Sequence, residues 1–110
     1  MALVVNSSTA GGKQPSAPLM AGKVDCDPDA SYPAGGYSLK STLPSGITIL
    51  AGEAVPHYDG AALRWFRIVD VSGTPTLKCY ANGSGAPGAE VAAATDLSGH
   101  NNVVVGYVGQ

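Results

Sequence analysis

The chain has 110 residues, and its 15 Gly and 8 Pro, both helix breakers, make up about a fifth of it. A helix bundle needs several long segments free of both, whereas the longest such stretch here is the apolar segment Ala61–Ser72. The hydrophobic share of 45% excludes simple disorder, and the net charge of −2 with six scattered cations provides no basic patch for nucleic acid.

The first half of the chain predicts an extended arm followed by short strands. Residues 1–18 begin with a short apolar piece and continue with Gly, Ser and Pro, so we interpret them as an extended N-terminal arm. Residues 19–110 then form a single β domain. Strands are expected, in chain order, at Leu19–Asp25, Ile47–Leu50 and Glu53–Tyr58. The last of these contains a proline, which places it at a sheet edge.

The clearest signal in the second half is a hairpin. Ala62–Val71 is expected as one strand, Ser72–Pro75 as the turn and Thr76–Ala81 as the return strand. Both faces of the first strand carry apolar side chains, as in a strand with one face on the core and the other on a neighbour. We assign Trp65, which lies beside two arginines, to the core.

The last part of the chain predicts a loop, a helical turn and a final strand. Asn82–Gly88 is expected as a flexible loop. The three alanines that follow Glu90 and Val91 favour a helical turn over Ala89–Thr95. Asn102–Val108 is a nearly continuous apolar run, which indicates a central strand. The fold class expected is all-β, a small antiparallel β-sandwich or jelly-roll-like barrel with an extended N-terminal arm.

Three closely spaced carboxylates suggest a calcium loop, and the spacing rejects it. Asp25, Asp27 and Asp29 alternate along the chain as in the first half of an EF-hand loop. Such a loop also needs Gly at its sixth position and Glu at its twelfth, where this chain has Ala30 and Gly36. We interpret the three aspartates as solvated turn carboxylates.

Other constellations are too sparse for catalysis. His57 and Asp59 are separated by one residue and His100 is distant, whereas a zinc site needs three or four converging ligands, so we interpret the histidines as polar loop residues. Glu53 and Glu90 are the conceivable glycosidase pair, but nothing in the sequence sets their separation. No nucleophile elbow, phosphate loop or dinucleotide fingerprint is present. The sequence predicts no enzyme, no metal site and no cofactor.

The whole chain also bears on location and redox state. No apolar run approaches the roughly 20 residues of a membrane span, so we expect no membrane partner. Met1–Val5 is short and lacks the basic start of a signal peptide. Without export, Cys26 and Cys79 are expected as free, buried thiols.

One motif resembles a known family. Ser31–Leu39 reads Ser-Tyr-Pro-Ala-Gly-Gly-Tyr-Ser-Leu and is similar to the Ser-Tyr-Pro-Thr-Gly-Gly-x-x-Leu signature of the capsid cement, or head decoration, proteins of tailed bacteriophages. The return strand with Leu77–Tyr80, the segment Glu90–Gly99 and the terminal strand Val103–Val108 fit the same family in order. The resemblance covers about residues 20–109, with Ala34 where the family usually has Thr.

The resemblance implies a non-enzymatic β-sandwich that binds the outside of the major capsid protein lattice, often as a homotrimer. It places the protein on the outer surface of the virion head after assembly in the host cytoplasm. Within the motif, Pro33 fixes φ before a Gly-Gly pair, which predicts a sharp corner. Contacts with the capsid or with neighbouring cement subunits are expected at Tyr32, Pro33, Gly35, Gly36, Tyr37, Leu3, Val4 and Val5.

Two other functions remain open on the sequence. A tail or baseplate β-module that binds a receptor or glycan would be favoured by exposed, clustered aromatic residues. A small hydrolase or metal-dependent domain would be favoured by a metal at Asp25–Asp29, or by a pocket that holds His57 with a carboxylate.

Overall fold

The computed structural model of the chain describes residues 3–10, 19–44 and 46–110, and within these ranges the regular structure is entirely β-strand. The strands are β1 (Val4–Ala10), β2 (Met20–Asp27), β3 (Tyr37–Ser38), β4 (Ile49–Gly52), β5 (Val55–Tyr58), β6 (Leu63–Val71), β7 (Thr74–Asn82), β8 (Pro87–Glu90) and β9 (Val103–Gly109). None of the described residues belongs to a helix that could cross a membrane.

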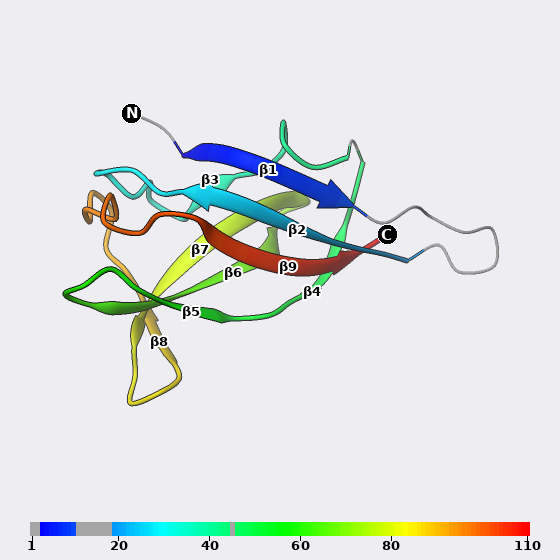
Figure 1. The fold of residues 1–110 in the computed structure, drawn as a ribbon. Coiled ribbons are helices and arrows are strands. Elements are labelled where there is room, and N and C mark those ends of the chain that lie inside the picture. Colours follow the sequence, from blue (N-terminus) through cyan, green and yellow to red (C-terminus); the bar gives the residue numbers. More distant parts are fainter. Residues whose placement is uncertain (1–2, 11–18, 45) are drawn as a thin grey trace.

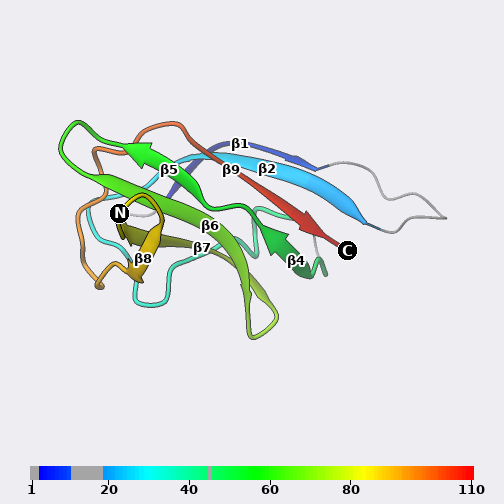
Figure 2. The same cartoon turned by 90° about the horizontal axis from the view of Figure 1, so that it is seen from below.

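The strands form two antiparallel sheets that lie over one another (Figures 1 and 2). One sheet has the order β1-β2-β9-β4, and the other has the order β3-β7-β6-β5 with β8 also paired to β7. The chain passes between the sheets from β4 to β5, and β5 lies at an edge, as its proline predicts. The expected all-β sandwich is confirmed.

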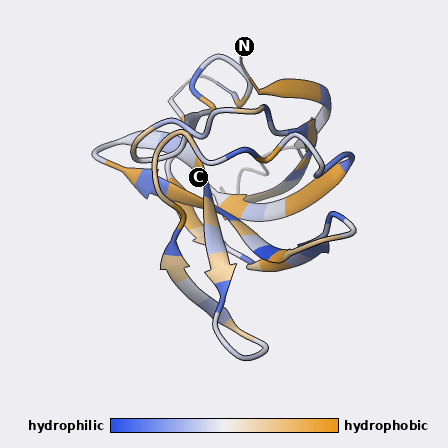
Figure 3. Cartoon of the chain, turned by 90° about the vertical axis from the view of Figure 1, so that its left-hand side faces the viewer, coloured by the Kyte–Doolittle hydropathy of each residue, from blue (hydrophilic) through white to orange (hydrophobic). Residues whose placement is uncertain are grey.

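The core fills the space between the two sheets. β6 and β7 contribute Phe66 and Leu77 from one side, and β2 and β9 contribute Val24 and Val105 from the other, all of them fully or almost fully buried. The hydropathy colouring in Figure 3 places most of the hydrophobic colour on the strands. Alternating side chains of both sheets therefore meet in one apolar layer.

β9 is central in its sheet, as predicted, because it pairs with both β2 and β4. Its apolar run does not mean burial on both faces. Val103 and Tyr107 point into the core, whereas Val104 and Val108 on the other face are 42% and 37% exposed.

The predicted hairpin is present with a shorter turn. β6 and β7 pair from Val71↔Thr74 onwards, so only Ser72 and Gly73 make the turn and the expected four-residue turn is wrong. Trp65 is not in the core: it lies half-buried on the outer face and donates its indole N–H to Asn82 Oδ1 at 3.2 Å.

The helical turn expected over Ala89–Thr95 is wrong. Pro87–Glu90 forms β8 along the free edge of β7, with Tyr80 opposite Glu90. The three alanines that follow form a tight turn and not a helix, because Ala94 has a φ of 68° and the Thr95 N–H donates to the Ala92 carbonyl at 3.3 Å.

Of the expected arm, residues 1–18, the structure describes residues 3–10. Residues 4–10 are β1, an edge strand paired with β2, and Leu3 and Val5 pack against the core. Residues 11–18 lie outside the described residues.

Candidate functional site

The corner, residues 31–38, turns sharply as its sequence predicts. Gly35 and Gly36 have φ values of 81° and 103°, and the Gly36 N–H donates to the Pro33 carbonyl at 3.0 Å. These positive φ angles are accessible to glycine at low steric cost, so the Gly-Gly pair is what allows the chain to reverse here. Pro33 and Gly35 remain exposed at the tip.

The two tyrosines of the corner face inward. Tyr32 and Tyr37 are 1% and 5% exposed, and their rings meet edge to face with centroids 5.5 Å apart. The Tyr37 hydroxyl donates to Asp29 Oδ1 at 2.8 Å and accepts the Asp29 N–H at 3.2 Å. Burial is the main reason that the pKa of each tyrosine is raised above its ordinary value. These side chains therefore cap the sandwich, and Pro33 and Gly35 are left exposed at the surface of the corner.

The corner and the N-terminal segment together border one open hollow of about 490 Å³. It is lined by Leu3, Val5, Asp29, Ser31, Pro33, Gly36, Tyr37, Ser38, Ser41 and Thr42. Five of the eight residues singled out in the sequence are therefore neighbours in space, although residues 3–5 and the corner lie far apart in the chain. Tyr32, Val4 and Gly35 do not line the hollow, and Val4 is 54% exposed beside it.

The interpretation of the three aspartates as solvated is wrong for one of them. Asp29 is 3% exposed, and its Oδ1 accepts hydrogen bonds from Tyr37 and from the Ser31 N–H at 3.1 Å. Asp25 and Asp27 are half-buried on β2 and both accept hydrogen bonds from the Asn6 amide. The carboxylates therefore brace the corner and β1.

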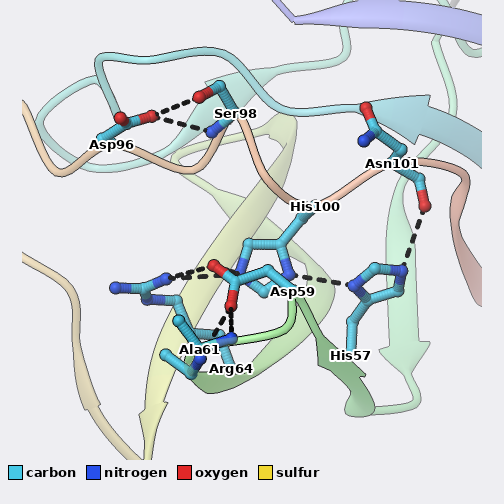
Figure 4. A network of polar contacts seen from close by, with 9 residues as sticks. His57, Asp59, Ala61, Arg64, Asp96, Ser98, His100 and Asn101 are labelled. Carbon is cyan, nitrogen blue, oxygen red and sulfur yellow. Dashed lines mark hydrogen bonds and ion pairs between the residues drawn. The ribbon is translucent and has the colours of Figure 1, made fainter.

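A second cluster gathers around the two histidines (Figure 4). The Nδ1 atoms of His57 and His100 are 2.9 Å apart, and His57 Nε2 lies 3.0 Å from the Asn101 carbonyl oxygen. On the far side, His100 Nε2 lies 3.3 Å from Arg64 Nη1 and 3.5 Å from Asp59 Oδ2. The interpretation as polar loop residues is wrong for His57, which belongs to β5. His100 does lie in a loop, but its side chain is fully buried.

The residues that the β5–β6 hairpin contributes to this cluster are close together in the sequence. β5 and β6 form a hairpin in which His57 pairs with Arg64, and Asp59 lies in the turn between the strands. The side chain of Asp59 accepts the N–H groups of Ala61 and Ala62, which lowers the pKa of its carboxyl. His100 joins from a loop 43 residues away, and no local pattern signals that contact.

The two histidines and Asp59 are residue types that bind metals, but they are not grouped as a metal site requires. Within the described ranges, no three His, Cys, Asp or Glu side chains are grouped so as to hold a metal ion. Glu90 forms an ion pair with Lys78 at 3.5 Å and accepts the Tyr32 hydroxyl, whereas Glu53 lies exposed beside a hollow formed by β2, β4 and β9. The two glutamates therefore occupy separate parts of the molecule.

The chain was compared with family models, curated proteins and solved structures, and none of the three matches it.

Proposed function

We propose that this protein is a capsid cement protein of a tailed bacteriophage, which binds the outer surface of the major capsid protein lattice. The observation that carries the proposal is the hollow beside the corner, because it unites Leu3 and Val5 with the motif residues Pro33, Gly36 and Tyr37. The all-β sandwich agrees with the fold that the resemblance implies.

The lining of the hollow suits an uncharged protein segment. Leu3, Val5 and Pro33 provide apolar surface, and Ser38 and Ser41 provide exposed hydroxyls around it. The one carboxylate in the lining already accepts hydrogen bonds from two neighbours, so it offers little to a charged ligand. A modest contact of this kind becomes effective when it is repeated over a capsid lattice and among neighbouring cement subunits.

The direct test is the position of the protein in purified virions, determined by cryo-electron microscopy. Density on the outside of the head, with the corner and residues 3–5 turned toward the capsid or a neighbouring copy, is expected. Density confined to the tail would overturn the proposal.

Substitutions at the hollow test the contact itself. Ser41→Arg introduces a long side chain at an exposed lining residue, and Ala86→Arg introduces the same charge at the exposed tip of the β7–β8 loop. We expect Ser41→Arg to lower the occupancy of heads by about tenfold or more, which corresponds to a loss of about 1.4 kcal/mol per site. The Ala86→Arg variant should bind as the unmodified protein does, and equal binding by both variants would contradict the assignment.

A second function has one observation in its favour. Trp65 and Tyr80 are directly opposite each other on the outer face of the β6–β7 pair, and Tyr58 on the neighbouring β5 is 63% exposed. Aromatic rings beside polar groups suit binding of a receptor or a glycan by a tail or baseplate module. Glycan-array binding that is abolished by Tyr58→Ala would support this function, together with tail density in the virion.

A further inference from the structure

The histidine cluster joins two segments that are distant in the chain. One is the β5–β6 hairpin, which carries His57, Asp59 and Arg64, and the other is the connection from β8 to β9, residues 91–102, which carries His100. In Figure 4 the Nδ1 atoms of the two rings point toward each other between these segments, and the ring planes are inclined by 61°. The ring of His100 also contacts Phe66 edge to face, with centroids 5.3 Å apart.

The groups that flank the two rings, the Asn101 carbonyl and the Arg64 guanidinium, determine which ring nitrogen carries each proton. The Asn101 carbonyl can only accept, so the Nε2 atom of His57 carries a proton and its Nδ1 is an acceptor in the neutral ring. The Arg64 guanidinium can only donate, so the Nε2 atom of His100 accepts and its Nδ1 carries the proton. The 2.9 Å contact is then an Nδ1–H donor of His100 meeting an Nδ1 acceptor of His57. When both rings are neutral, every contact from the Asn101 carbonyl through His57 and His100 to Arg64 pairs a donor with an acceptor.

A single added proton breaks this pattern. If His100 becomes doubly protonated, its Nδ1–H still donates to His57, and its Nε2 atom carries a second N–H. This second N–H faces the Arg64 guanidinium at 3.3 Å, where donor faces donor. That N–H finds a partner only in Asp59 Oδ2 at 3.5 Å, so the contact with Arg64 is lost.

The charges around His100 come from every segment that packs on it. Asp59 favours the protonated ring, whereas His57 and Arg64 disfavour it. Asp96 on the connection lies near Arg64 and Asp59, and Asp27 of β2 accepts the Asn102 N–H at 2.7 Å. Burial is the largest effect, and the pKa of His100 is lowered from its usual value near 6.5.

We propose that His57 and His100 form a pH-sensitive latch, which holds the connection, residues 91–102, on the β5–β6 hairpin at neutral pH and releases it on mild acidification. The inference is independent of the proposed function, since it rests on the donor and acceptor pattern of the cluster.

The connection held by the latch also contacts the corner, residues 31–38. The same connection bonds the corner, because the Tyr32 N–H donates to the Thr95 carbonyl at 3.0 Å and the Ala94 N–H donates to the Tyr32 carbonyl at 2.7 Å. The Leu97 N–H also donates to the Asp29 carbonyl at 3.0 Å. Release of the connection therefore loosens the support of the corner.

The tautomers are tested on the unmodified protein by ¹⁵N NMR of the histidine rings at pH 8. We expect His57 with its proton on Nε2 and His100 with its proton on Nδ1. The same tautomer in both rings would overturn the latch, and this measurement does not depend on a variant that must fold.

Release is tested by hydrogen exchange of the amides of Leu97 and His100, corrected for the intrinsic effect of pH. If the His100 ring must be neutral in the latched state, the protection of these amides against exchange falls by about tenfold between pH 7.5 and pH 5.5. His100→Asn keeps an N–H donor near the Nδ1 position and removes the titratable group, so its protection should be nearly independent of pH in this range. Unchanged protection in the unmodified protein, or an equal fall in His100→Asn, would overturn the proposal.

Discussion

The Tyr32 hydroxyl completes the hydrogen bonding of a strand edge. β3 covers Thr76 and Leu77 on one edge of β7, and β8 covers the same edge from Tyr80 onwards. The N–H of Cys79 lies in the gap between them and donates to the Tyr32 hydroxyl at 3.1 Å, and this hydroxyl donates in turn to Glu90 at 2.7 Å. The Tyr32 hydroxyl thus supplies the hydrogen-bond acceptor that a neighbouring strand would otherwise provide to Cys79.

We expect Tyr32→Phe to lower the free energy of unfolding by about 1–3 kcal/mol, because the buried Cys79 N–H then loses its acceptor. Tyr107→Phe is the matched control, since the Tyr107 hydroxyl is buried and has no hydrogen-bond partner among the described residues. Urea unfolding followed by the fluorescence of Trp65 measures both. Equal losses in the two variants would contradict the bridging role of Tyr32.

The two glycines of the corner differ in what surrounds them. A Cβ at Gly36 would lie 2.7 Å from the Leu77 carbonyl oxygen, whereas a Cβ at Gly35 would meet nothing within 4 Å. Gly36→Ala should therefore cost more than about 2 kcal/mol, through both strain and a backbone clash, and Gly35→Ala about 1 kcal/mol, through strain alone. Denaturant midpoints rank the two variants, and the reverse order would show that the corner is not held by this close approach.

At the scale of elements, the turn of the β6–β7 hairpin requires positive φ at two successive residues. Ser72 and Gly73 have φ values of 49° and 83°, as in a type I′ turn, and the Asp70 carboxylate accepts the Gly73 N–H at 3.2 Å. Asparagine adopts positive φ more readily than serine. Ser72→Asn should raise the free energy of unfolding by about 0.5 kcal/mol, and Ser41→Asn at an exposed serine elsewhere should leave it unchanged. Thermal unfolding of both variants tests this, and a loss in Ser72→Asn would argue against the turn type.

The sequence predicts the strands that have a local sequence signal and misses those that form only by pairing with another part of the chain. β6 and β9 follow from apolar segments, and the edge position of β5 follows from its proline. β8 has no such signal, because Pro87–Glu90 lies at the surface with no apolar side chain that packs on the core, and it is a strand only through pairing with the edge of β7. The same limit applies to the hollow. Pro33, Gly36 and Tyr37 were singled out by a family motif, whereas the approach of Leu3 to the corner became visible only in the fold.

For the whole molecule, stability should depend on pH in two separate windows. The pKa of His100 is lowered in the fold, so the unfolded chain binds the extra proton first and stability falls as pH drops below about 6.5. The pKa values of Asp59 and Asp96 are lowered by hydrogen bonds, so their contribution is present above the usual carboxyl range and is lost in more acidic solution.

Thermal unfolding from pH 8 to pH 3 measures both windows. His100→Asn should flatten the first and keep the second, and a transition temperature that stays constant between pH 7 and pH 5 would contradict the prediction.

The two native thiols are buried, so a cysteine introduced at the surface can be labelled selectively. Cys26 on β2 and Cys79 on β7 belong to different sheets, both are free and fully buried, and burial is the main reason that their pKa values are raised to about 12. Neither is a reactive thiolate at neutral pH while the sandwich is closed. A cysteine introduced at an exposed loop position such as Ala86 should therefore accept a maleimide fluorophore alone, without removal of the native pair. Labelling of all three would then report that the two sheets had separated.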